Sequence, residues 1–113
     1  MRFLLRSKIH KAIVTDANLK YEGSIAVDEA LLKKAGFWLG EKVLVVSNTT
    51  GARLETYIIK GEANSGLICM NGAAAHVIKK GEEIIIMGFK LSSKPIKARI
   101  VLVDKENRFV RLL

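Results

Sequence analysis

The pair Gly23-Ser24 has the most unusual chemical potential in this sequence. A serine hydroxyl can attack the preceding carbonyl carbon and move the acyl group from nitrogen to oxygen. The glycine leaves that carbonyl sterically open and tolerates a distorted turn. If the resulting ester eliminates, the chain breaks, the serine becomes dehydroalanine, and loss of ammonia leaves a pyruvoyl ketone. Most Gly-Ser pairs are ordinary turn residues, so both interpretations stay open at this point.

Arg53, Thr56 and Tyr57 lie on one short segment and could form a site for a dicarboxylate. A guanidinium binds a carboxylate through two parallel hydrogen bonds, and a nearby phenol can give or take a proton. The alternative is structural: Thr and Tyr are common in strands, and an arginine at the start of the segment fits a solvated edge.

The segment Asn71-Gly72-Ala73-Ala74-Ala75-His76 could cradle a carboxylate. Exposed N–H groups at a helix N-terminus bind anions, and small side chains allow close approach. The alternative is a helix start that packs tightly through its small residues. Lys8, His10 and His76 are by themselves typical of exposed or structural positions.

Val, Ile and Leu occur in short runs broken by Gly, Asn and Asp, which is a pattern typical of strands. We therefore expect strands to position these residues. Asp28 predicts the N-cap of a helix over residues 29–35 that Gly36 ends, and Asn71 is expected to cap a second short helix through Val77. Turns are expected at residues 16–18, 48–51 and 104–107. The expected strands cover residues 8–15, 25–27, 43–46, 53–59, 67–70, 84–87 and 99–103, followed by a tail over 109–113.

A weak internal repeat relates residues 40–46, which begin Gly-Glu-Lys-Val, to residues 81–87, which begin Gly-Glu-Glu-Ile. Each copy follows an expected short helix that starts at a capping residue. A duplicated unit of helix, turn and strand suggests a barrel with pseudo-twofold symmetry. The alternative is coincidence, since Gly-Glu followed by aliphatic residues is common before strands.

Composition predicts one globular domain of 113 residues. No apolar run approaches the roughly 20 residues of a membrane helix, and the N-terminus does not resemble a secretory signal. The single cysteine, Cys69, cannot form an internal disulfide, which fits the cytoplasm. The two histidines and one cysteine have no metal-ligand spacing.

The net charge of +8, from 19 Lys and Arg against 11 Asp and Glu, favours an anionic partner, either a nucleic acid, an acidic membrane surface or an acidic small molecule. A well-solvated surface is the alternative, because the lysines are scattered. No signature of an RNA-recognition motif, zinc finger or helix-turn-helix is present.

Five blocks, in order and covering nearly the whole chain, resemble the pyruvoyl-dependent aspartate 1-decarboxylase family: Ser7-Lys8-Ile9-His10-Lys11, Thr15-Asp16-Ala17-Asn18-Leu19, Tyr21-Glu22-Gly23-Ser24, Thr56-Tyr57 and residues 71–76. The match is weakest from about Leu91 onward. The resemblance implies a mainly β fold, a double-psi β-barrel with short helices, in agreement with the repeat. It also implies a homotetramer with active sites between neighbouring subunits.

The same resemblance implies a self-processing zymogen. Cleavage between Gly23 and Ser24 would give a β chain of residues 1–23 and an α chain of residues 24–113 whose first residue is the pyruvoyl group. L-Aspartate would form a Schiff base with that ketone, lose carbon dioxide and leave as β-alanine for pantothenate and coenzyme A synthesis. The ketone would be the electron sink, with no metal and no pyridoxal phosphate.

Roles carry over residue by residue where the blocks match. Tyr57 matches the proton donor, and Thr56 matches the residue that assists self-cleavage by stabilising the oxyanion. Residues expected to contact the substrate through basic, hydroxyl or backbone groups are Lys8, Arg53, Thr56, Gly72, Ala73 and Ala74. Supporting roles are expected for His10, Tyr21 and Asn71.

Two departures from the family pattern put substrate tuning in question. Val46-Ser47 stands where Trp-Asn is common, and Leu54-Glu55 stands where Phe-Ser is common. Glu55 could pair with Arg53, repel the substrate, or point into solvent or a subunit contact. The competing hypothesis is a non-enzymatic basic β-barrel that binds nucleic acid, and nucleic acid is the less favoured partner.

Overall fold

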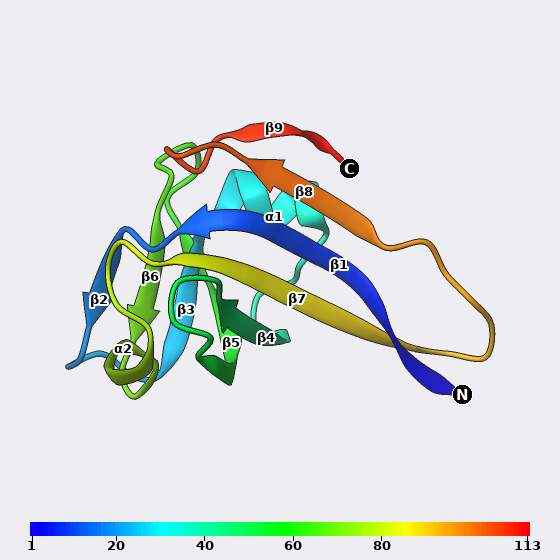
Figure 1. Cartoon of the computed structure of the whole chain (residues 1–113), viewed down its shortest axis with the longest axis horizontal. Coiled ribbons are helices and arrows are strands. Elements are labelled where there is room, and N and C mark those ends of the chain that lie inside the picture. The colour runs from blue at the N-terminus through cyan, green and yellow to red at the C-terminus, as the bar shows by residue number, and fades with distance from the viewer.

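The computed structural model describes all 113 residues and consists mainly of strands with two short helices (Figure 1). Along the chain the elements are β1 (Arg2–Ile13), β2 (Asp16–Asn18), β3 (Ser24–Asp28), α1 (Glu29–Ala35), β4 (Lys42–Ser47), β5 (Arg53–Gly61), β6 (Ile68–Asn71), α2 (Ala74–Val77), β7 (Glu83–Ser92), β8 (Arg99–Val103) and β9 (Phe109–Leu112). The prediction of a mainly β fold with short helices is confirmed.

The sheet closes into a barrel because one stretch of chain pairs on both of its sides. The strand order is β2-β6-β3-β5-β4-β7-β1-β8-β9, and β1 passes through only Val14 and Thr15 into β2. The Val14 N–H donates to the Glu82 carbonyl at 3.0 Å, and the Thr15 N–H donates to the Ile68 carbonyl at 2.8 Å. The continuous β1–β2 segment therefore joins β7 to β6, which leaves β8 and β9 as an extension outside the closed ring.

The internal repeat corresponds to a local two-fold relation between strands. The two copies align Val45 with Ile86, and these residues pair directly where β4 and β7 run antiparallel. The flanking pairs are crossed: Leu44 lies opposite Met87, and Val46 lies opposite Ile85. A two-fold axis between the strands requires this pattern, so the two copies of the repeat are in register about the local axis of this strand pair.

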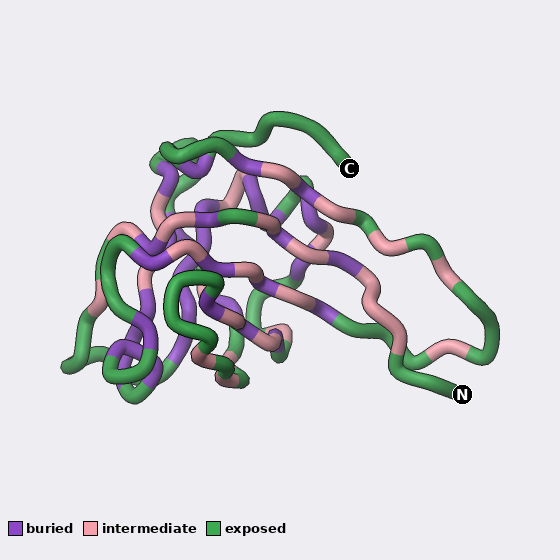
Figure 2. Tube along the Cα trace, viewed as in Figure 1, coloured by how far each residue is buried: buried purple, intermediate pink, exposed green.

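The hydrophobic core fills the barrel. Strands β4 and β7 alternate buried and half-buried residues, as expected when one face of a strand points inward. Five isoleucines from five strands, Ile9, Ile25, Ile58, Ile68 and Ile86, have no exposed surface at all. Burying a side chain of this size contributes about 1.5–3 kcal/mol. Figure 2 shows buried stretches along the strands and helices of the barrel, whereas both chain ends are exposed.

The first helix forms as the sequence predicts. The Asp28 carboxylate accepts a hydrogen bond from the Ala30 N–H at 2.8 Å, and Gly36 ends the helix with a φ of 74°. Asp28 also accepts hydrogen bonds from the N–H groups of Asn64 and Gly66, both at 2.9 Å. The cap residue therefore also fixes the loop between β5 and β6.

The predicted N-cap at Asn71 is wrong. Asn71 is the last residue of β6, and α2 begins after Ala73, which makes no side-chain capping bond. The reason is that the Asn71 amide is used by Ser24, and Gly72 then turns the chain with a φ of 63°.

Other boundaries shift because of pairing between distant segments. The expected turn at residues 16–18 is the strand β2, which runs parallel to β6, and most of the expected tail is β9, which pairs with β8. Strands β1 and β7 are longer than expected, since Arg2 pairs with Ser92. Their outer ends form a two-stranded arm beyond the barrel (Figure 1), where Phe3 is 76 % exposed.

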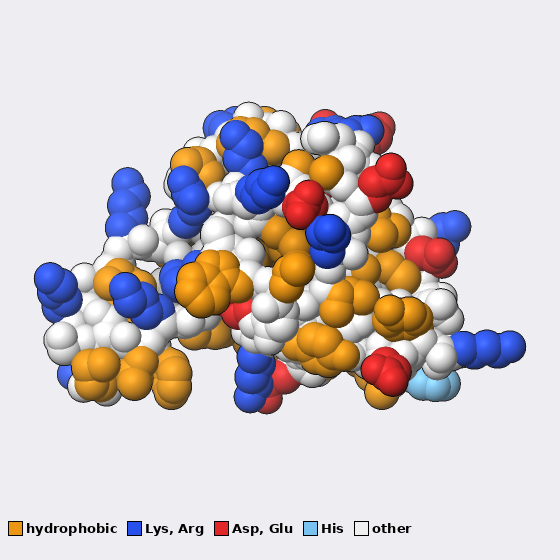
Figure 3. Space-filling view, turned by 180° about the vertical axis from the view of Figure 1, so that it is seen from behind, with side chains coloured by type: hydrophobic (Ala, Val, Ile, Leu, Met, Phe, Trp, Pro, Cys, Tyr) orange, Lys and Arg blue, Asp and Glu red, His pale blue; other side chains and the backbone are white.

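No helix in the chain has the length and apolar character needed to cross a membrane. Basic side chains do not gather in one patch on the face seen in Figure 3, where they are interspersed with acidic and hydrophobic groups. A continuous basic stripe, which nucleic-acid binding would favour, is not seen on this face.

Candidate active site

Ser24 is the first residue of β3 and has no exposed surface. It pairs directly with Asn71 on the antiparallel strand β6. The Asn71 Nδ2 donates a hydrogen bond to Ser24 Oγ at 3.0 Å, and Ser24 Oγ donates one to the Glu22 carbonyl at 3.3 Å. These two hydrogen bonds hold the Ser24 hydroxyl in one orientation beside the Gly23–Ser24 peptide bond.

The backbone at Gly72 packs against the residues before Ser24. A Cβ at position 72 would lie 2.7 Å from the Gly23 nitrogen and 2.7 Å from the Tyr21 carbonyl oxygen. The Gly72 N–H donates to the Asn18 carbonyl at 2.8 Å. Position 72 therefore needs glycine for two independent reasons, the close approach and the positive φ.

Gly23 borders a pocket of about 340 Å³, a size within the range of small-molecule sites. Strand β5 forms one wall, and the region of α2 forms the other. Strand β5 runs parallel to β3 with Ile25 opposite Ile58, so Tyr57 lies beside Ser24 in the register. The lining residues are Gly23, Leu54, Glu55, Thr56, Tyr57, Ala73, Ala74 and Val77.

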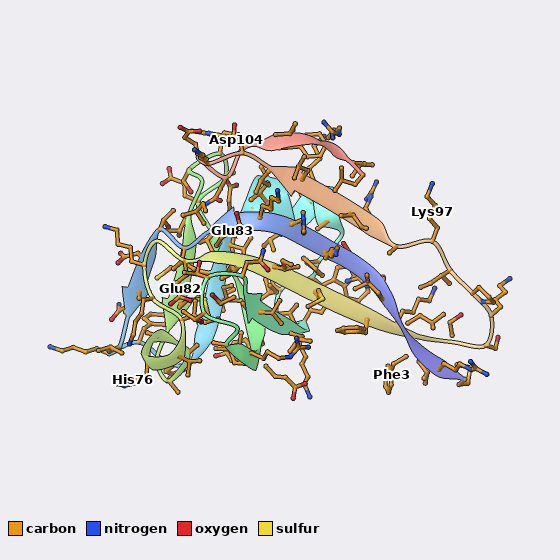
Figure 4. The ribbon with its side chains drawn as sticks, in the orientation of Figure 1. Phe3, His76, Glu82, Glu83, Lys97 and Asp104 are labelled. Carbon is orange, nitrogen blue, oxygen red and sulfur yellow. The ribbon has the colours of Figure 1, made fainter.

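Most of the site residues expected from the sequence therefore lie together. Gly23, Thr56, Tyr57, Ala73 and Ala74 line one pocket, and the Tyr57 side chain is 41 % exposed. Ser24 and Asn71 are buried directly behind Gly23 and are joined by a hydrogen bond. Tyr21 contributes its backbone carbonyl beside Gly72. His76 is exposed on α2, and Figure 4 shows it on the outer side of that helix.

Three expected residues are not brought to this pocket within one chain. Lys8 and His10 lie on β1, and β7 and β4 separate β1 from β5 in the sheet. Along the sheet, three strand spacings of about 4.8 Å, about 14 Å in all, separate β1 from the pocket strand. Arg53 opens β5 on the exposed side, does not line the pocket, and forms no ion pair.

His10 lies half-buried with its Nδ1 buried and without a hydrogen-bond partner. Burial lowers the pKa of His10, the positive charges of Lys8 and Lys11 lower it further, and Glu83 opposes them. The imidazole is therefore neutral at neutral pH and available as an acceptor or donor beside Lys8.

Ser47, one of the departures from the family pattern, faces away from the pocket. It is buried, and its Oγ donates a hydrogen bond to the Glu82 carboxylate at 2.6 Å. Glu82, which is labelled in Figure 4, also accepts hydrogen bonds from the Lys79 N–H at 2.7 Å and from Thr50 Oγ1 at 3.4 Å. Burial raises the pKa of Glu82, but these hydrogen bonds together bring it below its usual range.

Glu55, the other departure, lines the pocket and pairs with Lys42, not with Arg53. The Lys42 Nζ lies 3.1 Å from the Glu55 carboxylate, and both side chains are mostly exposed. Such a pair contributes about 0–1 kcal/mol, so Glu55 is free to reorient.

The sequence did not predict Leu54 and Val77 as pocket residues. It also did not predict that Cys69 would contact Asn71. The Cys69 Sγ donates a hydrogen bond to Asn71 Oδ1 at 3.3 Å. For Leu54 and Cys69 the available signal was spacing. Each lies two residues before an expected site residue on the same strand, Thr56 or Asn71, and residues two apart on a strand share a face.

Gly72→Ala is expected to prevent correct packing of the Gly23–Ser24 segment. The new methyl group would overlap backbone atoms that cannot rotate away, so we expect a loss of about 1–3 kcal/mol in stability, measured by denaturant unfolding. Gly51→Ala is the matched control, because Gly51 has a φ of 82° with nothing within 4 Å of its Cβ position. Equal losses in the two variants would contradict the packing argument.

Comparison with known proteins identifies the family. Residues 1–110 match the family model described as aspartate decarboxylase. The chain is 54 % identical to an aspartate 1-decarboxylase of Caldicellulosiruptor bescii, over 96 % of this chain and 88 % of that protein. It is 48 % identical to one of Bacillus pumilus over 99 % of this chain and 91 % of that protein, and 51 % identical to one of Corynebacterium efficiens over 99 % and 85 %. The chain therefore belongs to the aspartate decarboxylase family.

Proposed function

We propose that this chain is an enzyme that decarboxylates L-aspartate to β-alanine and carbon dioxide and so supplies pantothenate synthesis. The observation that carries the proposal is the buried Ser24, held after Gly23 by Asn71 at the edge of a pocket that Tyr57 lines. Membership in the aspartate decarboxylase family supports the same activity. A non-enzymatic nucleic-acid-binding barrel is not favoured.

Self-cleavage is the first chemical step that this site supports. Ser24 Oγ attacks the Gly23 carbonyl carbon, a C–O bond forms, the C–N bond breaks, and the hydroxyl proton ends on the Ser24 nitrogen. Loss of the Ser24 α-proton then breaks the Cβ–Oγ bond, and the electron pair leaves with the Gly23 carboxylate. Water converts the remaining dehydroalanine to the pyruvoyl group and ammonia. The products are chains of residues 1–23 and 24–113.

The surroundings of Ser24 fit a pyruvoyl group. Nothing lies within 4 Å of the Cβ position of Gly23, so that side of the cleavage bond is open, whereas any side chain at Gly72 would collide with Gly23. The pyruvoyl group would supply an electron sink for the electron pair that stays on the substrate when carbon dioxide leaves. No metal and no pyridoxal phosphate has a part in this proposal.

This chain's own residues would bind the substrate and move the proton. Thr56 lines the pocket beside Gly23, and its hydroxyl would stabilise the oxyanion that forms on Gly23 during self-cleavage. The Tyr57 phenol lines the pocket and would donate a proton to the substrate carbon after carbon dioxide leaves. The backbone from Gly72 to Ala74, of which Ala73 and Ala74 line the pocket, would form the wall against which the substrate lies.

We propose a homotetramer in which a neighbouring subunit completes the site. Aspartate carries two carboxylates, but the pocket in one chain is lined by no basic residue. Lys8 and His10 on β1 and Arg53 on β5 lie on the outer face of the barrel. Between them, half-buried apolar residues cross β4 and β7: Leu44, Val46, Ile85 and Met87. A second copy packed on this face would bring basic groups to the pocket.

Co-expression of two defective variants tests the shared site. We expect Lys8→Ala to weaken substrate binding by about 10–100-fold, because a charged hydrogen bond is lost, and Tyr57→Phe to slow turnover. In mixed oligomers about a quarter of the sites would combine an intact Lys8 with an intact Tyr57 from another subunit. Activity no higher than that of the separate variants would contradict a shared site.

Intact mass measurement under denaturing conditions tests the proposal as a whole. We expect two fragments divided between Gly23 and Ser24, with β-alanine formed from aspartate. A single uncleaved chain without activity would contradict the proposal, and strongly salt-dependent DNA binding by that chain would favour the basic barrel. The cytoplasm is the proposed location, because a lone reduced cysteine is ordinary there.

A further inference from the structure

We propose that Cys69 is a positioning residue for self-cleavage, because its thiol fixes which end of the Asn71 amide faces Ser24. The inference rests on the proposed cleavage at Gly23–Ser24. It assigns a purpose to a cysteine that neither binds substrate nor lines the pocket.

The geometry is a chain of three hydrogen bonds that ends at the attacking oxygen. Cys69 Sγ donates to Asn71 Oδ1 at 3.3 Å, and Asn71 Nδ2 donates to Ser24 Oγ at 3.0 Å. Ser24 Oγ in turn donates to the Glu22 carbonyl at 3.3 Å. Cys69 lies two residues before Asn71 on β6, so both side chains lie on the strand face that Ser24 also shares.

An asparagine amide can present either its oxygen or its nitrogen to a neighbour, and the two orientations have similar shapes. A thiol that donates to Oδ1 favours the orientation in which Nδ2 points at Ser24. Without that donor, a flipped amide would accept the serine proton through Oδ1, and no N–H group would face the serine oxygen.

The orientation matters because Ser24 Oγ becomes more negative in two steps. It does so when the hydroxyl loses its proton during attack, and again when the Cβ–Oγ bond breaks and the oxygen leaves as part of the Gly23 carboxylate. An N–H group directed at that oxygen stabilises both states, whereas a carbonyl oxygen in the same place would repel the charge.

The thiol is held in the protonated, donating form. Burial raises the pKa of Cys69, the carboxylate of Asp16 raises it further, and a hydrogen bond from the Asn18 backbone opposes them without cancelling the rise. Asp16 is its direct neighbour on β2, and the uncharged Ala26 is its neighbour on β3. At neutral pH the donor is therefore present, and it is lost only in alkaline solution.

Three substitutions separate positioning from packing. Each full-length chain is made by cell-free translation, and the uncleaved fraction is followed over time by denaturing mass spectrometry. We expect Cys69→Val, which removes the donor and is somewhat larger than cysteine, to slow cleavage about tenfold, the effect of one lost hydrogen bond. Cys69→Ala should be similarly slow, and Cys69→Ser, which restores a donor, should return to within about threefold of wild type.

A pH profile gives the second readout. Cleavage of the wild-type chain should slow as the thiol ionises in alkaline solution, and Cys69→Ser should lack that decline. Wild-type rates in Cys69→Val, or equal slowing in Cys69→Ser and Cys69→Val, would overturn the positioning role while the cleavage proposal stands. A wild-type chain that never cleaves would overturn both.

Discussion

Ser24→Ala is expected to leave the protein as a single chain of 113 residues and to lower β-alanine formation by at least about 10⁶-fold, the lower end of enzymatic accelerations. The physical reason is complete: no hydroxyl remains to attack Gly23, so neither the chain break nor the pyruvoyl group can form. Intact mass and the rate of β-alanine formation are measured on the same sample.

Folding must be checked separately, because Ser24 is buried. Alanine fits the space of serine, and the Asn71 amide loses one acceptor, which costs about 1–3 kcal/mol. Ser93→Ala is the matched control, since Ser93 is exposed and does not line the active-site pocket. This variant should cleave and turn over normally. A cleaved or active Ser24→Ala chain would refute the assignment of Ser24.

Tyr57→Phe is expected to cleave normally and to lower kcat by about 10²–10⁴-fold, the usual contribution of a positioned proton donor. The ring keeps its place on β5 beside Ser24, and only the hydroxyl is lost. The rate is expressed per cleaved chain, which separates turnover from processing.

The same variant distinguishes proton donation from binding. A loss confined to KM would mean that the phenol binds substrate without transferring a proton. A wild-type kcat would remove Tyr57 from its proposed role, and a failure of cleavage would place the phenol in the self-processing step instead.

Local signals in the sequence predicted the local structure well. Asp28 and Gly36 bound the first helix because a cap needs only nearby backbone groups. Asn71 is also a typical capping residue, but the predicted cap was wrong there, because the Asn71 amide donates its hydrogen bond to Ser24, which is far away in the sequence. The lengths of β1 and β7 were missed for a related reason: their outer halves are held mainly by pairing with each other.

The site was predictable to the extent that it lies within one chain. Gly23, Thr56, Tyr57 and the segment after Asn71 meet at one pocket, as expected. Lys8 and His10 do not reach it, because β7 and β4 separate β1 from β5 in the sheet, and Arg53 does not line it. Residue types alone carry no information on which subunit supplies a group. The sequence therefore predicted these basic residues but not the subunit from which they would reach the pocket.

The way in which β1 and β2 close the barrel makes maturation a one-way process. Under the proposed cleavage, the fragment of residues 1–23 holds both strands, and their partners β6, β7 and β8 all belong to the other fragment. Ile9, Ala12 and Val14 of the small fragment are fully or almost fully buried in the shared core. The mature barrel is then a tight complex of two peptides, assembled while they were still one. Once unfolded, it would have to re-form by a bimolecular encounter, so its recovery would depend on protein concentration whereas that of the uncut precursor would not.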